Sequence, residues 1–191
     1  MIMKLKYAIG FILIGLASIS HATYYTSLGL VRPTVTVTSD SMTGSAEPAL
    51  VEGTLGISLY DDFLFAEGRL ALGFSEGDFP AGTRSIDVNY IFTADLLAEL
   101  PITNNLSVYG LVGANGIFMD YTIRVINALA LNQEESDGGP VTGWGIRYRW
   151  NDWAWIDLGY RHFYDDQLDF RFTDPLGLKI SGWTTAFEAR F

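Results

Sequence analysis

The chain has 191 residues, of which 49% are hydrophobic and 14% aromatic, and it carries a formal net charge of −10 at pH 7. It has no cysteine, which excludes disulfides, zinc–thiolate sites and thiol nucleophiles. The acidic balance disfavours nucleic acid as a partner, and the length fits a single domain.

Residues 1–22 have the pattern of a cleaved secretory signal peptide. MIMKLK supplies two lysines, YAIGFILIGLASIS is an apolar run, and Ser20-His21-Ala22 places small residues where signal peptidase cuts. A membrane anchor is the alternative, but the run is shorter than the roughly 20 apolar residues that a spanning helix needs. We therefore expect a mature chain of residues 23–191, whose formal charge is about −12 because Lys4 and Lys6 leave with the signal.

Eight stretches of the mature chain alternate apolar and polar residues with the period of two that is typical of β-strands. In chain order, the predicted strands are Tyr24–Val31, Leu50–Tyr60, Phe63–Phe74, Ser85–Leu100, Leu106–Phe118, Val141–Trp150, Trp153–Tyr164 and Ile180–Phe191. The fifth is rich in glycine and is the least decisive of the eight.

The connections between these strands alternate between long and short. The long ones are Arg32–Pro48, Ser75–Thr83, Met119–Pro140 and Asp165–Leu178, and the short ones are Asp61-Asp62, Pro101–Asn105 and Asn151-Asp152. This alternation is typical of an up-and-down transmembrane barrel, with short turns in the periplasm and long loops outside. The predicted fold is therefore all-β, an eight-stranded antiparallel transmembrane β-barrel. A soluble lipocalin-like barrel, with its apolar residues inside, is the alternative.

The charged residues fall on the polar faces of the predicted strands. The fourth strand, for example, would place Ile86 and Val88 toward lipid and Asp87 toward the lumen. An arginine that faces lipid at the midplane costs about 2–4 kcal/mol, whereas in the lumen it can pair with a carboxylate. The predicted lumen charge network comprises Glu52, Glu67, Arg69, Asp87, Asp95, Glu99, Arg147, Arg149, Asp157, Arg161, Glu188 and Arg190.

Eight strands enclose a space that side chains just fill, so we expect this network to plug the lumen. The alternative is a narrow channel for small solutes or ions.

The last predicted strand carries Trp183, Phe187 and Phe191 on one face and ends in an aromatic residue. With the segments 108–113, 157–161 and 186–191, it resembles the small outer-membrane barrels of the OmpA/OmpX type, often labelled porin family. The resemblance covers essentially the whole mature chain. It implies a barrel in the outer membrane of a Gram-negative cell, with Trp183, Phe187 and Phe191 read by the barrel-assembly machinery.

We do not expect an enzyme. Acyl-transfer chemistry needs a base in contact with a nucleophile, and His162 is the single histidine of the mature chain. Lipid A deacylase barrels use a His-x-Ser spacing, but Tyr164 stands at the serine position here. We interpret His162 as an interface residue, and a lipid-modifying enzyme that uses Asp165 or Ser181 ranks third among the functions considered.

No cofactor or metal site is expected. Two acidic loop clusters offer oxygen ligands without EF-hand spacing, and we interpret them as solvated loops rather than divalent-ion sites: Glu134, Glu135 and Asp137, and Asp165, Asp166 and Asp169. Two other loop features would suit a partner, namely the alternating Thr34–Thr38 and the apolar Val125–Leu131. The simpler interpretation is that both extend the neighbouring strands.

The predicted protein is thus an integral outer-membrane barrel with a salt-bridged lumen, whose loops serve envelope integrity or surface interaction such as adhesion. The expected partners are outer-membrane lipids, lipopolysaccharide, the assembly machinery and a surface ligand at the loops. We expect a monomer.

Overall fold

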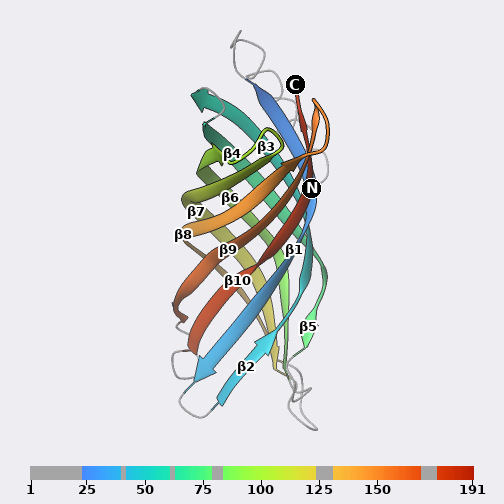
Figure 1. Ribbon diagram of the computed structural model, residues 1–191. Helices are drawn as coiled ribbons and strands as arrows, with labels where there is room; N and C mark the ends of the chain where they lie inside the picture. The colour runs from blue at the N-terminus through green and yellow to red at the C-terminus, as the bar shows by residue number, and fades with distance from the viewer. Residues whose placement is uncertain (1–22, 40–41, 61–62, 79–83, 124–130, 169–175) are drawn as a thin grey trace, which may run out of the picture.

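The strands of the protein form one antiparallel sheet that closes into a barrel (Figure 1). The computed structural model describes residues 23–39, 42–60, 63–78, 84–123, 131–168 and 176–191. In these ranges, no helix has the length and apolar character needed to cross a membrane. The strands are β1 (Tyr24–Ser39), β2 (Met42–Ala46), β3 (Ala49–Tyr60), β4 (Leu64–Ser75), β5 (Gly77–Asp78), β6 (Arg84–Pro101), β7 (Leu106–Ile123), β8 (Leu131–Arg149), β9 (Ala154–Leu168) and β10 (Leu176–Arg190).

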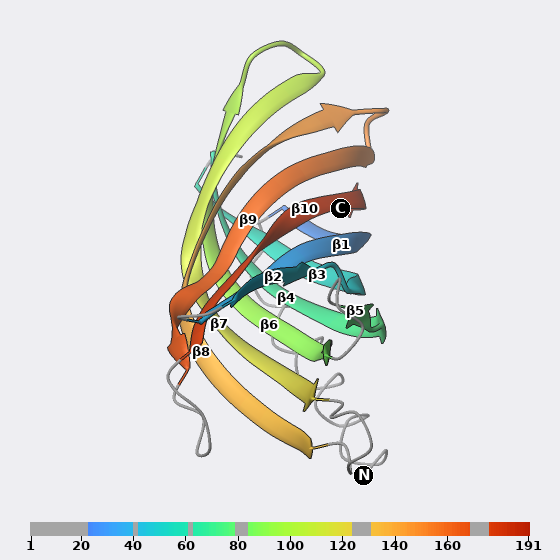
Figure 2. The ribbon, with the colours of Figure 1, turned by 90° about the horizontal axis from the view of Figure 1, so that it is seen from below.

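Eight of these strands make the barrel wall. Each pairs with the next in the order β1, β3, β4, β6, β7, β8, β9 and β10, and β10 pairs with β1 to close the wall. At the seam the Phe191 amide donates to the Tyr24 carbonyl at 2.8 Å. The predicted eight-stranded up-and-down barrel is confirmed, and Figure 2 shows its strands curving around one axis.

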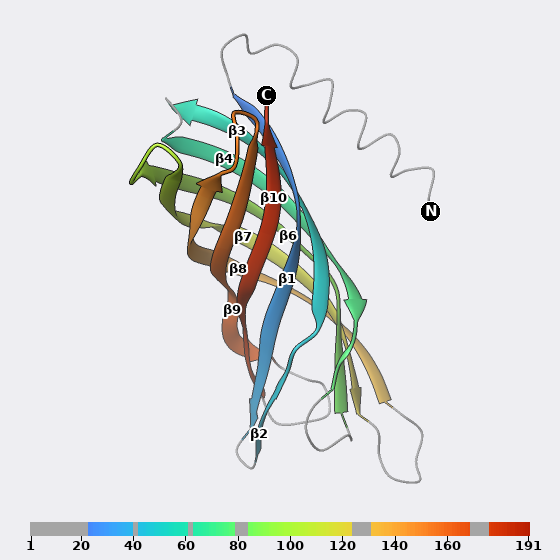
Figure 3. The ribbon, with the colours of Figure 1, turned by 45° about the vertical axis from the view of Figure 1, so that its right-hand side comes forward.

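The two ends of the barrel differ. The short-turn end holds the turns around 101–106 and 149–154 and the end of β10, while β2 and β5 lie at the opposite, long-hairpin end (Figure 3). In the second of these turns, the Asn151 side chain accepts hydrogen bonds from the amides of Trp153 and Ala154. An asparagine that bonds the backbone ahead of it is a common way to stabilise a tight turn.

Several strands run further than the sequence predicted. Residues 32–48 were predicted to be a polar loop, but β1 continues to Ser39 and β2 pairs back onto it. Much of 119–140 is also strand, because β7 and β8 stay paired as far as Ile123 and Leu131. Pairing satisfies the backbone groups of these segments, and inward apolar residues such as Val35, Val37 and Met119 are buried in the barrel.

The extension of the first strand through Thr34–Thr38 is therefore confirmed. Residues 125–130 of the apolar run and the predicted signal peptide, 1–22, lie outside the described ranges. The predicted turn at Asp61-Asp62 lies outside them too.

A β-bulge reverses the faces of β6. Val88 pairs with Met119 and Tyr90 with Phe118, so Asn89 is the extra residue. Beyond the bulge, Ile86 and Val88 point inward, with 1% and 0% of their surface exposed. The prediction that Ile86 and Val88 face lipid while Asp87 faces the lumen is therefore wrong, because one extra residue exchanges the two faces of a strand.

The barrel interior has two layers. Strands that leave the short-turn end carry polar inward residues first and apolar ones later: on β9, Asp157 and Arg161 precede Phe163. We call the polar part, which also contains Phe65 and Leu97, the charged layer. The apolar layer lies nearer the long-hairpin end, and its buried members include Val31, Val35, Leu50, Ala71, Ile86, Val88, Ile91, Ile117, Met119, Val141, Phe163, Leu178 and Ile180.

Tyr109 packs in the charged layer over two glycines of neighbouring strands. Its hydroxyl donates to Asp157 at 2.8 Å. A Cβ atom added to Gly145 or Gly159 would lie 2.4 or 2.3 Å from that same hydroxyl. Glycine is required at both positions because the phenol ring occupies the space of a side chain.

We expect Gly145→Ala to lower the free energy of unfolding by about 1 to 3 kcal/mol, because the methyl group would displace the Tyr109 hydroxyl from Asp157. Gly68→Ala is the matched control, since a Cβ there meets nothing within 4 Å. Urea unfolding of the refolded barrel measures both variants. Equal midpoints for the two would contradict the packing role of Gly145.

Candidate functional site

The candidate site is the charged layer of the lumen. Among the described residues it contains six buried carboxylates and four guanidinium groups, contributed by six of the eight wall strands. The carboxylates are Glu52, Glu67, Asp95, Glu99, Asp157 and Glu188, and the guanidinium groups are Arg69, Arg147, Arg161 and Arg190.

Arg147 occupies the centre of this layer, with 1% of its side chain exposed. Its guanidinium binds one carboxylate from each of four other strands: Glu67 at 2.8 Å, Glu99 at 3.0 Å, Asp157 at 2.9 Å and Glu188 at 3.3 Å. The planar group presents donors in fixed directions, which suits contacts with several carboxylates at once. Arg147 thereby links β8 to β4, β6, β9 and β10.

Two tyrosines complete the surroundings of Arg147. The Tyr25 hydroxyl donates to Glu67, and the guanidinium carbon of Arg147 lies 5.2 Å from the Tyr25 ring centroid and 5.0 Å from that of Tyr109. Such cation–π contacts strengthen when water is excluded. Tyr25 was not among the predicted site residues, although its inward position follows from the period-two pattern of β1.

Glu52 forms the second centre of the network. Arg161 donates two hydrogen bonds to it, at 2.6 and 3.0 Å, and Arg69 donates a third at 3.2 Å. Arg69 also binds Glu67, and its Nε lies 3.2 Å from Asp95. Because Arg69 and Arg147 share Glu67, the two centres form one continuous network.

Arg190 ends the network at the short-turn end. It binds Glu188 at 2.6 Å and Glu99 at 2.9 Å. Ser107 donates to the other oxygen of Glu99 at 2.5 Å.

The structure brings ten of the twelve predicted lumen residues together in this network and leaves two apart. Asp87 is absent because of the bulge in β6 and lies opposite Asp120 on the outside. Arg149 points inward but sits at the rim of the barrel, where it pairs with the exposed Asp152 at 2.7 Å. Arg149 is the next inward-facing residue after Arg147 on β8 and lies beyond the charged layer. Alternation gives the face of a residue but not this depth along the barrel.

The network carries more negative than positive groups. Six carboxylates face four guanidinium groups, and several buried polar atoms of the described residues lack a hydrogen-bond partner, among them Thr54 Oγ1, Asp95 Oδ1 and Arg161 Nε. Such atoms cost free energy unless water or a proton satisfies them. The charged layer is therefore packed, but its polar groups are not all paired with one another.

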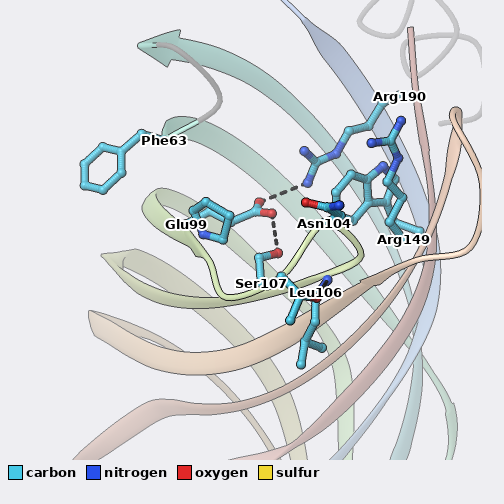
Figure 4. Close-up of a pocket in the computed structure, with 10 residues that line it drawn as sticks. Phe63, Glu99, Asn104, Leu106, Ser107, Arg149 and Arg190 are labelled. Atoms are coloured by element: carbon cyan, nitrogen blue, oxygen red, sulfur yellow. Dashed lines mark hydrogen bonds and ion pairs between the residues drawn. The ribbon is translucent and has the colours of Figure 1, made fainter.

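A pocket of about 410 Å³ opens at the short-turn end, directly beside the network. Figure 4 shows Arg149 and Arg190 next to each other on one side of it, with Glu99 and Ser107 across from them. Arg190 lies over the Trp155 ring at 4.0 Å, and Arg149 lies 5.9 Å from the same ring centroid.

His162 lies on the outer surface, where its ring meets Tyr160 edge to face at 5.6 Å. Ser181 stands opposite it on β10, but the Ser181 hydroxyl accepts from Tyr160 at 2.9 Å. No hydrogen bond among the described residues joins His162 to Ser181, so a base–nucleophile pair is not assembled there. Within the same ranges, no group of three or more His, Cys, Asp or Glu side chains could hold a metal ion.

The three aromatic residues predicted to form the assembly signal lie on the outer surface. Trp183, Phe187 and Phe191 are 51%, 50% and 79% exposed. Trp183 packs with Trp144 and Tyr160, and Phe187 packs with Trp153. Recognition of these residues by the assembly machinery stays a prediction.

We expect Arg147→Gln to destabilise the barrel by about 3 to 5 kcal/mol, because it leaves four buried carboxylates without their shared cation. Arg149→Gln should change stability by less than about 1 kcal/mol, since its partner Asp152 is 97% exposed and the pair is solvated. Urea unfolding in the same detergent compares the two variants. A small effect at Arg147 would show that the network does not hold the strands together.

Residues 9–191 match the family model described as the outer membrane protein beta-barrel domain. No curated protein matches the chain. Solved structures with the same fold include Neisserial surface protein A, at a TM-score of 0.58 and 12% sequence identity, covering 88% of this chain and 97% of that one.

Two further solved structures are similar. Ail, the attachment invasion locus protein of Yersinia pestis, solved with the heparin analogue sucrose octasulfate, has a TM-score of 0.56 and 17% identity, with 89% and 99% of the two chains covered. OprG of Pseudomonas aeruginosa has a TM-score of 0.57 and 12% identity, with 89% and 96% covered. The closed barrel and the match over nearly its whole length agree that this chain belongs to the outer membrane protein beta-barrel family.

Proposed function

We propose that this protein is a non-conducting barrel of the outer membrane that acts at the cell surface, in surface interaction such as adhesion or in envelope integrity. The short turns of such barrels face the periplasm, so the long-hairpin end faces outward. The proposal rests mainly on the apolar layer, which lies between the charged layer and the outside.

The apolar layer would obstruct the passage of ions. Val31, Leu50, Val88, Ile117 and Ile180 are all fully buried, and they come from five different wall strands. An ion that left the charged layer would have to shed its water among these side chains, which is costly without a compensating partner. A packed apolar layer above a salt-bridged one therefore favours a closed lumen.

The outer part of the wall supports a role in surface interaction. β7 and β8 contain 18 and 19 residues, well beyond the 9 to 11 that a tilted strand needs to cross a bilayer. Their hairpin therefore extends above the membrane and places Asp120 and Asp137 outside it. Ail is named for attachment and invasion, which agrees with a surface role but is a property of that protein.

An exposed strand edge adds to this support. Pairing of β8 with β9 begins at Thr142 and His162, so in the described pairing residues 131–141 form backbone pairs with β7 alone, and β9 reaches them through the Tyr164 side chain, whose hydroxyl donates to Asp137. Pro140 has no N–H to donate to β9, which favours separation at this point. Unpaired strand edges can accept an extended segment of another chain.

A narrow channel is the second candidate function. The excess of carboxylates and the unpaired polar atoms of the charged layer would suit water or a cation, and the pocket opens this layer toward the periplasm. In this alternative the apolar layer would have to move.

We expect the refolded mature protein to show no single-channel steps in planar bilayers. Arg147→Gln should stay silent where it folds, because the apolar layer is unchanged. Phe163→Ala combined with Ile117→Ala should produce steps, since it thins the proposed seal. Steady, ion-selective steps from the unmodified protein would contradict the proposal of a closed barrel and favour the channel.

We expect replacement of residues 120–135 by a two-residue turn to leave the barrel folded, because residues 120–123 pair with residues 131–134 in the part of the hairpin above the membrane. Cells that carry this variant should lose adherence or resistance to detergent, whereas cells with Gly68→Ala should keep both. Heat-dependent mobility on gels verifies folding of each variant. If the shortened variant behaved like the unmodified protein in both assays, the outer hairpin would have no part in the function.

A further inference from the structure

The pocket at the periplasmic end contains charged groups that the surface role does not use. Glu99 lines it, but Ser107 binds one of its carboxylate oxygens, and Arg147 and Arg190 bind the other. Three donors neutralise this carboxylate. The pocket is therefore dominated by its two arginines, Arg149 and Arg190.

The two arginines differ in how firmly they are held. Arg190 is fixed by Glu188 and Glu99, and its guanidinium lies over the Trp155 ring at 4.0 Å. Arg149 is 37% exposed and pairs with Asp152, which water surrounds. Solvated ion pairs of this kind contribute little free energy, so another anion can replace Asp152.

The rest of the lining is apolar or weakly polar. Pro101, Leu106 and Trp155 supply apolar surface, and Thr103 and Asn104 supply polar groups from the turn between β6 and β7. The volume of about 410 Å³ lies in the range of roughly 300–1,000 Å³ that is usual for small-molecule sites. Such sites combine apolar walls with a few directed polar groups.

We propose that this pocket binds a small organic carboxylate from the periplasm. The carboxylate lies against Arg149 and Arg190, and an apolar or aromatic body lies against Trp155 and Leu106. Binding exchanges the Arg149–Asp152 pair for a pair between Arg149 and the ligand, while Arg190 keeps its place in the lumen network. The site is independent of the outer hairpin and of whether the lumen conducts.

The test uses the refolded mature protein in lipid nanodiscs and the probe N-acetyl-phenylalanine, with its neutral amide as the matched control. Calorimetry or saturation-transfer NMR measures the dissociation constants. We expect the acid to bind at least about tenfold more tightly than the amide, the size of one charge-assisted hydrogen bond. Equal binding of acid and amide would overturn the proposal.

Three variants locate the site. Arg149→Gln should weaken binding of the acid about tenfold, and Asp152→Asn should strengthen it severalfold by releasing Arg149. Arg32→Gln removes an exposed arginine on the β1 segment beyond the charged layer and should change nothing. Unchanged affinity in both Arg149→Gln and Asp152→Asn would also overturn the proposal, and because both positions are at the surface, their folding is not at risk.

A longer probe, acetyl-Gly-Gly-Phe, identifies the source of the carboxylate. Tighter binding than that of N-acetyl-phenylalanine would assign the site to peptide C-termini. Weaker or equal binding would assign it to free acids. In either case the preference of the acid over its amide supports the site.

Discussion

Because the sheet is closed, the inward polar side chains of its strands must find their hydrogen-bond and ion-pair partners among one another. Arg147 takes part in more of these contacts than any other residue of the charged layer. Its guanidinium binds carboxylates from four strands and contacts the rings of Tyr25 and Tyr109 from two more. In a bilayer, no solvent is available at the wall to replace these partners. A single cation in the centre thus constrains the relative positions of most of the wall.

The two layers give the two ends of the barrel different properties. The charged layer joins strands through directional contacts and reaches the pocket at the short-turn end through Arg190 and Glu99. The apolar layer fills the space toward the long-hairpin end with side chains that need no directional partners. Strands can therefore separate there, as β8 and β9 do beyond Thr142 and His162. Asn115 bridges this divergence, accepting from the Gly139 amide and donating to the Phe163 carbonyl. The firmly joined inner layer and the unpaired outer strand edge agree with the proposed role in surface interaction.

Most of the site could be predicted because a transmembrane strand alternates between lipid and lumen. Glu52, Glu67 and Arg69 were correctly assigned to the inside because a charge on the lipid face is costly over the whole span. The same rule failed at Asp87, where Asn89 is inserted and the faces exchange. It also failed to separate Arg147 from Arg149, since alternation gives the face of a residue but not its depth in the barrel.

The sequence by itself determined the number of wall strands, the alternation of short and long connections and the face of most residues, because these follow from a period of two and from the cost of charge in lipid. Only the tertiary structure decided which carboxylate meets which arginine, where the lumen changes from charged to apolar, and that Arg149, Arg190 and Trp155 enclose a pocket. These features depend on the stagger between strands that are far apart in the chain. Stagger is set when β10 pairs with β1 and the whole interior packs together, and no local pattern encodes it.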